Sequence, residues 1–299
     1  MQITDNVYQI KTRMPFSPTP DVSMYVIKGD DKTAIIDTGI GDKTSILAAK
    51  KIIGELGGLD LIINTHEHFD HFAGNVKIKE FANANLNANV SVAAHEFAAS
   101  IIENPMILAP KKGKNTYLNF LSKLEPTKVD IGLKGGEIID LGSIKLRVIH
   151  TPGHAPGHVC LYAEQEKILF SGDQVIGIGT PYVGKEGSKN GGMSDYIKSL
   201  KNLLDLDLKL LLPAHGPISK KPHKKIKETM DHKLVREKEI LNALKSGEKT
   251  IEQLIKETYK LNETIMLKGS ILGYLSKLKQ ENKVVEVEKN KRYRLVKEF

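Results

Sequence analysis

Apolar positions in the first 220 residues fall into two alternating kinds of stretch. Short runs rich in β-branched residues at 23–27 and 33–37 predict two strands joined by a turn. Asp42 is expected to cap a helix over 43–56, which two glycines end. Further elements are predicted as strands at 59–64, 90–94, 137–139, 144–149, 159–163, 167–170 and 209–212, and as helices at about 72–83, from 95 and at 195–204. This alternation predicts two sheets packed together with helices outside.

The chain after residue 216 is helical and rich in lysine. Thr250 and Gln253 form a capping box, which starts a helix, and Asn262 is expected to cap a second helix with one apolar side. Two short strands, at 284–287 and 293–296, then predict a hairpin. Helices followed by a hairpin is the order of elements in a winged helix.

The composition is that of an ordinary globular protein, with 40% hydrophobic and 27% charged residues in 299. The N-terminus lacks the features of a secretory signal, and no apolar run approaches the roughly 18 residues of a membrane span. Cys160 is the single cysteine, which excludes an intrachain disulfide and a thiolate zinc cage. We expect a cytoplasmic protein that does not enter a membrane.

The net charge of +8 is unevenly distributed along the chain. Residues 222–299 hold 19 basic and 12 acidic residues, whereas 1–221 hold 25 and 24. We therefore expect a nearly neutral large domain over 1–221 and a basic winged-helix-like domain over 222–299. Basic domains favour polyanions such as single-stranded RNA, and a solvated lysine- and glutamate-rich surface fits the same counts.

Three histidines and an aspartate are crowded into the turn Thr-His-Glu-His-Phe-Asp-His at 65–71, directly after the apolar run 59–64. If all of them were charged, the imidazoles would repel one another. A divalent metal takes neutral imidazole nitrogen and carboxylate oxygen as ligands, which removes this repulsion. The turn therefore predicts a metal site.

Three later residues, His154, Asp173 and His215, each follow a predicted strand and are flanked by glycine or proline. Rigid strand ends are where binding sites are usually built. A site with two metal ions needs more ligands than one turn supplies, so these residues are the remaining candidates.

In order and spacing, these segments resemble the metallo-β-lactamase fold hydrolases over residues 1 to about 220. The resemblance implies an α+β fold, a four-layer αβ/βα sandwich, with two divalent ions. The implied ligands are His66, His68 and His154 for one ion, Asp70, His71 and His215 for the other, and Asp173 as the bridge. Asp70 and Asp173 are the candidate catalytic residues. Zinc is the favoured metal, and manganese and iron accept the same ligands.

Further candidate residues are expected around this implied site. His158 could hold the His154 loop as a neighbour of the ligands, and Thr180 and Tyr182 are candidates for the substrate pocket. The irregular stretch 104–128 is a candidate lid. The oligomeric state is open, a homodimer included.

Two metal ions imply hydrolysis by a bridging hydroxide, with no covalent enzyme intermediate. No G-x-S-x-G motif is present, which disfavours a serine nucleophile. The family members that open β-lactams usually carry a cysteine where this chain has Asp173, so the resemblance disfavours antibiotic hydrolysis.

The resemblance extends to the subgroup with a C-terminal winged helix, which includes a lactamase-beta-like endoribonuclease and proteins named for hydroxyacylglutathione hydrolase. The matching stretches are 170–173, 177–180, 195–196 with 199–200, 214–217, 232–240 and 275–281. Because the tail is basic, single-stranded RNA is the favoured substrate, and a small acyl thioester or ester is the alternative. A non-catalytic nucleic-acid-binding protein with a structural metal and a mononuclear iron oxygenase are further alternatives.

Overall fold

The computed structural model describes residues 1–14, 20–86, 88–108, 120–184, 191–262, 264–287 and 291–296. Contacts between Cα atoms divide the chain into two compact units. The first unit comprises Met1–His150, Gly157–Ile178 and Asp207–Pro222, and the second comprises Thr151–Pro156, Gly179–Leu206 and His223–Phe299. The main break in the chain therefore falls next to the predicted boundary at 221, and two earlier segments group with the C-terminal residues.

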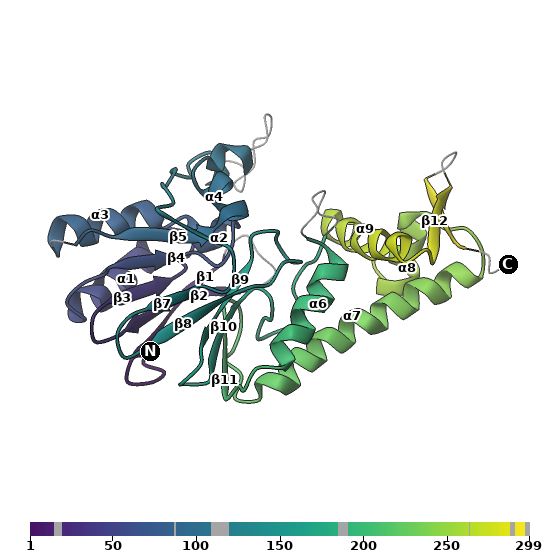
Figure 1. Ribbon diagram of the computed structural model, residues 1–299. Helices are drawn as coiled ribbons and strands as arrows, with labels where there is room; N and C mark the ends of the chain where they lie inside the picture. The colour runs from purple at the N-terminus through teal and green to yellow at the C-terminus, as the bar shows by residue number, and fades with distance from the viewer. Residues whose placement is uncertain are drawn as a thin grey trace. The chain divides into compact units, whose positions relative to one another are not determined.

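Two β-sheets form the centre of the first unit (Figure 1). The six-stranded sheet has the order β1-β2-β3-β4-β5-β6, and the five-stranded sheet has the order β11-β10-β9-β8-β7. The strands are β1 Val7–Arg13, β2 Asp21–Lys28, β3 Thr33–Ile36, β4 Leu61–Ile63, β5 Ser91–His95, β6 Ile131–Leu133, β7 Ile138–Asp140, β8 Lys145–His150, β9 Val159–Ala163, β10 Ile168–Gly172 and β11 Leu210–Pro213. Strands β3 to β6 are parallel to one another, as are β10 and β11.

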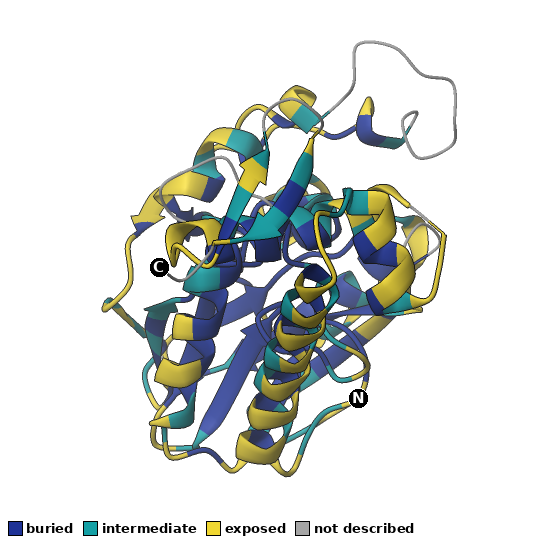
Figure 2. Cartoon of the chain, turned by 90° about the vertical axis from the view of Figure 1, so that its right-hand side faces the viewer, coloured by how far each residue is buried: buried dark blue, intermediate teal, exposed yellow. Residues whose placement is uncertain are grey.

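The main hydrophobic core lies between the two sheets and takes buried residues from both. Tyr25 of β2 and Phe170 of β10 pack edge to face with ring centroids 5.4 Å apart. The Tyr25 hydroxyl also donates a hydrogen bond to the carbonyl of Pro213 at 2.8 Å. Each fully buried aliphatic side chain contributes about 1.5–3 kcal/mol, so this layer fixes the sheets against each other. Figure 2 shows most of the central strands coloured as buried, whereas β7 has exposed positions.

Helices cover the outer face of the six-stranded sheet. The helices of the first unit are α1 Lys43–Glu55, α2 Phe69–Phe72, α3 Asn75–Asn85 and α4 Glu96–Ile102, followed by the 3-10 helix η1 Pro105–Leu108. A second core, between the sheet and α1 and α3, contains Ile46, Ile53 and Ile78. Asp42 caps α1 as predicted, because its carboxylate accepts hydrogen bonds from the next turn.

Sequence patterns did not predict strands β1 and β6. β1 lies at the edge of its sheet and alternates only partly between buried and exposed positions. β6 has three residues with Gly132 at its centre, which is too short for a period to be recognised. Of the candidate lid over 104–128, residues 109–119 lie outside the described residues.

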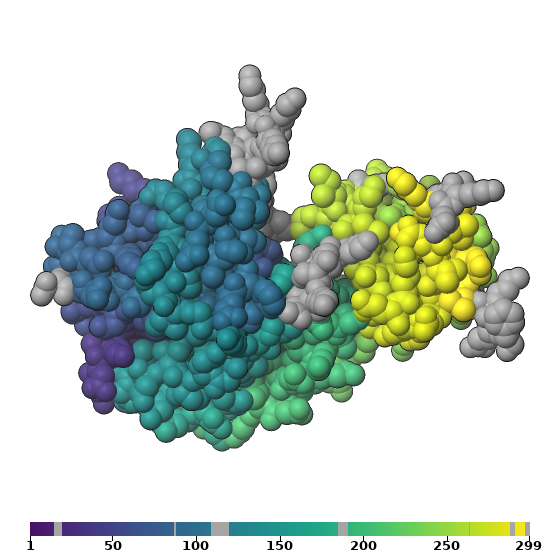
Figure 3. Space-filling view, turned by 45° about the horizontal axis from the view of Figure 1, so that its top comes forward, coloured from purple at the N-terminus to yellow at the C-terminus, as the bar shows by residue number. Residues whose placement is uncertain are grey.

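The second unit is mainly helical. Its elements are α6 Met193–Leu204, α7 Pro222–Lys245, α8 Ile251–Tyr259, α9 Ile265–Gln280, β12 Val284–Val287 and β13 Arg292–Leu295. Helix α6 packs on α9, which explains why it groups with the C-terminal residues. The segment of α8, α9 and the hairpin appears in yellow and yellow-green in Figure 3. The winged-helix assignment and the fourth layer of the sandwich, which would need α6, stay predictions.

Capping of the two C-terminal helices was predicted correctly for one and wrongly for the other. Thr250 and Gln253 form both hydrogen bonds of the capping box at α8. The cap of α9 is Thr264 and not Asn262, because Thr264 has the extended backbone of a cap and its hydroxyl accepts from the N–H of Leu267. Among the described residues, no helix combines the length and the apolar character that a membrane crossing requires.

Candidate metal centre

The predicted metal-binding turn connects β4 to the short helix α2. His66 is fully buried, His68 occupies the N-cap position of α2, and Asp70 and His71 lie inside that helix. The apolar strand β4 is buried between its neighbours, so the polar residues that follow it emerge at the carboxyl end of the parallel strands. The fold therefore brings four candidate ligands to one edge of the sheet.

Two groups of side chains in the first unit could each hold a metal ion. Their members are His66, His71 and Asp173 in one group and Asp70, His71 and His215 in the other. Within each group, the potential ligand atoms lie within 4.8 Å of one another. The predicted ligand His68 lies beside them, with its Nδ1 2.9 Å from Nε2 of His66. Six of the seven predicted ligands thus converge although they come from three separate segments.

Hydrogen bonds orient two of these rings. His71 Nδ1 lies 2.7 Å from a carboxylate oxygen of Asp37, and His215 Nδ1 lies 2.5 Å from the carbonyl oxygen of Asp21. Because these partners accept, each Nδ1 donates, and each Nε2 is left to face the cluster. His71 Nε2 is buried and has no hydrogen-bond partner. The donor set and this buried nitrogen fit a divalent metal that takes imidazole and carboxylate ligands.

The charges of the cluster shift the pKa values of its members. Burial lowers the pKa of His71, but Asp37, Asp70 and Asp173 outweigh this effect and raise it to about 9. The pKa of His215 is raised to about 11, because Asp173 and Asp70 outweigh its burial. Its Nε2 lies 3.3 Å from an oxygen of each carboxylate. Burial opposes ionisation of Asp70, yet the adjacent imidazoles hold its pKa below the usual range.

Asp37 is a site residue that sequence reasoning missed. It is buried, follows β3, and has a positive φ of 57°, which aspartate tolerates better than most residues. Its carboxylate accepts hydrogen bonds from the N–H of Thr65 at 2.7 Å and from the Thr65 hydroxyl at 2.8 Å, besides facing His71. Asp37 therefore fixes both the start of the metal-binding turn and the ring of one ligand. Its local pattern, an acidic residue followed by Thr-Gly at a strand end, is one that ordinary turns share.

A buried network of amides supports the same turn. Asn64 donates to the carbonyl of His71 at 3.0 Å and exchanges further hydrogen bonds with Asn75. The Thr38 hydroxyl donates to Asn75 at 2.8 Å. All three side chains are fully buried, so leaving any one of them unpaired would cost about 1–3 kcal/mol.

The other candidate site residues lie outside the two ligand groups of the first unit. His158 Nε2 accepts a hydrogen bond from the backbone N–H of Asp173 at 3.0 Å, so it contacts the backbone of a ligand. His154 is also among the candidate metal-binding side chains. Within the second unit, its Nδ1 lies 2.7 Å from the carbonyl oxygen of Tyr182, and Thr180 Oγ1 lies 3.5 Å from His232 Nδ1. A substrate-pocket role for Thr180 and Tyr182 stays a prediction.

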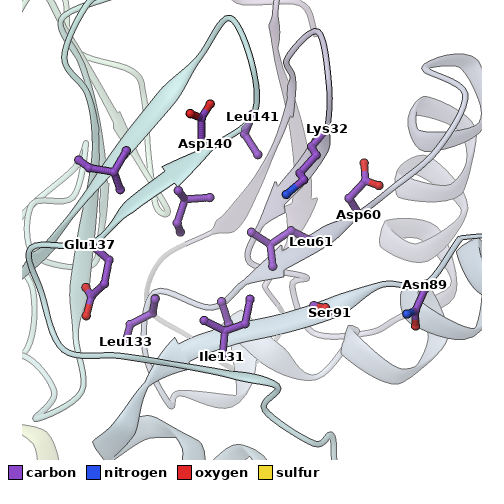
Figure 4. Close-up of a pocket in the computed structure, with 13 residues that line it drawn as sticks. Lys32, Asp60, Leu61, Asn89, Ser91, Ile131, Leu133, Glu137, Asp140 and Leu141 are labelled. Carbon is purple, nitrogen blue, oxygen red and sulfur yellow. The ribbon is translucent and has the colours of Figure 1, made fainter.

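A separate cavity of about 530 Å³ lies at the other end of the strands of the first unit (Figure 4). It is lined by residues that begin or precede parallel strands, including Lys32, Asp60 and Ser91, and by apolar residues such as Leu61 and Ile131. The metal-binding turn follows the carboxyl end of β4, whereas Asp60 precedes that strand. None of the residues that line this cavity is a candidate ligand, so it is distinct from the metal centre.

Residues 18–215 match the sequence profile of the metallo-beta-lactamase superfamily. The chain belongs to this superfamily. The acyl-coenzyme A thioesterase MBLAC2 of Bos taurus is 26% identical over 228 residues, which are 71% of this chain and 78% of that protein. The atrochrysone carboxyl ACP thioesterase nsrC of Aspergillus novofumigatus is 26% identical over 248 residues, 82% of this chain and 65% of the relative.

Solved structures show the same fold. A metallo-beta-lactamase family protein of Thermus thermophilus superposes with a TM-score of 0.82 at 23% identity, covering 99% of this chain and all of the other. The predicted mixed α/β metallo-β-lactamase fold is thereby confirmed. The prediction of an enzyme of the metallo-hydrolase class is confirmed as well, at the level of the superfamily.

Zinc binding to this metallo-β-lactamase fold protein is expected to release protons. At pH 7.5 the metal-free His71 and His215 are protonated, since their pKa values are about 9 and about 11. Coordination requires neutral imidazole, so filling this site should release about two protons, and the apparent zinc affinity should rise with pH towards 9. Titration calorimetry in buffers of different ionisation enthalpy measures the number released.

His95→Gln is the matched control for that titration. Burial, followed by the charge of His150, lowers the pKa of His95 to about 4, so this ring is already neutral and its loss should leave the proton count unchanged. Zinc binding without proton release would contradict the assignment of His71 and His215 as ligands.

Proposed function

We propose that this chain is a two-metal hydrolase of acyl thioesters. The observation that carries the proposal is that relatives named as thioesterases, one for acyl-coenzyme A and one for an acyl carrier protein, align with 71% and 82% of the chain. These relatives favour the thioester alternative over single-stranded RNA, which the sequence alone had favoured.

Ion pairs in the C-terminal segment weaken the argument for RNA. Among the described residues, seven of its 19 basic side chains pair with neighbouring acids, in Lys277–Glu237, Lys277–Glu281, Arg236–Glu239, Lys249–Glu257, Lys279–Glu286, Lys283–Glu281, Arg294–Glu248 and Lys224–Glu228. A lysine that already pairs with a carboxylate contributes less binding free energy when it contacts a phosphate. The net excess of +7 is unchanged by these pairs, and it is carried by the basic side chains outside them.

Aromatic platforms for stacked bases are also few. Tyr274 and Tyr293 are buried at 2% and 5% exposure, as expected for residues of the core of this segment. Stacking of single-stranded bases needs exposed ring faces. The described C-terminal residues therefore supply little of what RNA recognition requires.

The residues of the first unit can support hydrolysis in defined roles. When bound, the two ions would supply an acidified water and an electrophile for the thioester carbonyl. His66, His68, His71, Asp70, Asp173 and His215 would hold them, with His154 as the predicted seventh ligand. Asp70 is ionised at neutral pH, because its pKa is held low, so it can orient the attacking water and accept its proton. Attack on the carbonyl carbon breaks the C–S bond and releases a thiol and a carboxylic acid.

A substrate comparison tests the proposal. Zinc-loaded protein is incubated with acyl-coenzyme A, an acyl-glutathione and a labelled single-stranded RNA, with thiol release and RNA length as readouts. We expect thiol release at least about 10²-fold above the rate without protein, and intact RNA. Cleaved RNA without thiol release would overturn the proposal. Intact substrates with tight RNA binding would favour a non-catalytic nucleic-acid-binding protein.

A further inference from the structure

The short loop Pro181–Gly184 touches a predicted metal ligand inside the second unit. The carbonyl oxygen of Tyr182 accepts a hydrogen bond from Nδ1 of His154 at 2.7 Å. Because a carbonyl can only accept, Nδ1 carries the proton and Nε2 keeps its lone pair for a metal. The position of this loop therefore sets the tautomer and the direction of the His154 ring.

Helix α9 carries two glycines, one turn apart, at the point where it meets this loop. A Cβ on Gly269 would lie 2.0 Å from the Tyr182 hydroxyl, and a Cβ on Gly273 would lie 3.0 Å from the carbonyl oxygens of Val183 and Gly184. Glycine inside a helix costs about 0.5–1 kcal/mol relative to alanine. Here the missing side chains let the loop approach the helix closely.

Two other helices hold the same region. Lys233 of α7 is buried, and its Nζ donates to the carbonyl of Pro181 at 2.6 Å. In α6, the Ser199 hydroxyl donates to the carbonyl of Pro152, two residues before His154, at 2.9 Å. Burial, helped by the charge of Arg236, lowers the pKa of Lys233 to about 7. A neutral amine still has N–H donors, so its contact with Pro181 does not depend on the charge.

We propose that α6, α7 and α9 act as a positioning scaffold for His154, with Gly269, Gly273 and Lys233 as its key positioning residues. The helices of the second unit then set the ring of a predicted metal ligand that lies within the same unit. The inference rests on the proposed function only in taking His154 as a metal ligand.

Glycine variants test the scaffold through metal affinity. Gly269→Ala and Gly273→Ala should each weaken the more labile zinc ion about 10-fold, within the range found when the partners of ligands are removed. Competition with a chromogenic chelator measures this without any substrate. The ring N–H signal of His154 in nuclear magnetic resonance, identified by its loss in His154→Ala, should shift in both variants.

Gly54→Ala is the matched control for the helix. Gly54 lies in α1, and a Cβ there would meet nothing within 4 Å, so the substitution adds helix propensity without a clash. Its zinc affinity should equal that of the unmodified chain. Unchanged affinity and an unmoved His154 signal in the Gly269 and Gly273 variants would overturn the inference.

Lysine variants provide a second, independent test. Lys233→Met should weaken the same ion about 3- to 10-fold, and Lys233→Arg, which keeps N–H donors, should restore part of the loss. Lys238→Met, at an exposed position of the same helix, is the control. Equal losses for Met and Arg, with the His154 signal unmoved, would overturn the role of Lys233.

The two proposals fail in different ways. Protein that binds zinc as described but does not hydrolyse thioesters would refute the proposed function and leave the scaffold intact. A His154→Ala variant with unchanged zinc affinity would refute the scaffold and leave the thioesterase assignment to the substrate assay.

Discussion

Asp173→Asn is expected to lower kcat/KM for acyl-thioester hydrolysis about 10³-fold or more, equivalent to about 4 kcal/mol of transition-state stabilisation. Asp173 contributes to one candidate metal group, and its carboxylate also lies 3.3 Å from His215 Nε2. An amide is a neutral and weaker ligand of nearly the same size, so the fold should persist while the negative charge of this candidate ligand is lost. Thiol release and elemental analysis of the purified variant measure both effects.

Asp140→Asn is a suitable control, because Asp140 is exposed, lies at the end of β7 and lines the cavity that is distinct from the metal centre. Its turnover and zinc content should match those of the unmodified chain. Unchanged turnover of Asp173→Asn at full metal content would refute the assignment of the metal centre.

Asp37→Asn is expected to weaken zinc binding about 10- to 100-fold, the range reported for partners of metal-bound histidine. Asn tolerates the positive φ at this position as well as Asp does, so the backbone should remain as it is. The variant loses the negative charge that faces His71 Nδ1 and fixes its tautomer. Chelator competition gives the affinity, and the pKa of the His71 ring in metal-free protein should fall from about 9.

Asp42→Asn controls for an Asp-to-Asn change at a nearby position, since Asn caps a helix as well as Asp. Both its affinity and the titration of His71 should be unchanged. If Asp37→Asn binds zinc as tightly as the control does, Asp37 supports the fold of the turn and does not act through His71.

Much of the fold and most of the ligands could be predicted because their signals are local. The string at 65–71 places its ligands within one turn, and His154, Asp173 and His215 each follow an apolar run that ends at a glycine or proline. Burial of a strand and the turn after it are set by neighbouring residues. Such local features can be recognised in a single sequence without knowledge of distant contacts.

The parts that were missed depend on distant contacts. Asp37 acquires its role from Thr65 and His71, about 30 residues further on, and no local pattern distinguishes it from an aspartate in an ordinary turn. The edge strand β6 is defined by its pairing with β5. The expectation of RNA rested on a net charge, and a count of lysines does not show which of them face carboxylates.

The amide network of Asn64, Asn75 and Thr38 has a consequence for how such an enzyme can change. The buried polar groups of this network are paired in the observed arrangement, and a displacement would leave them unpaired. The backbone around His71 therefore has little freedom to move. We therefore expect changes in substrate specificity to arise from substitutions in segments outside this network. Substitutions outside this network are therefore expected to leave the backbone of the metal-binding turn in place.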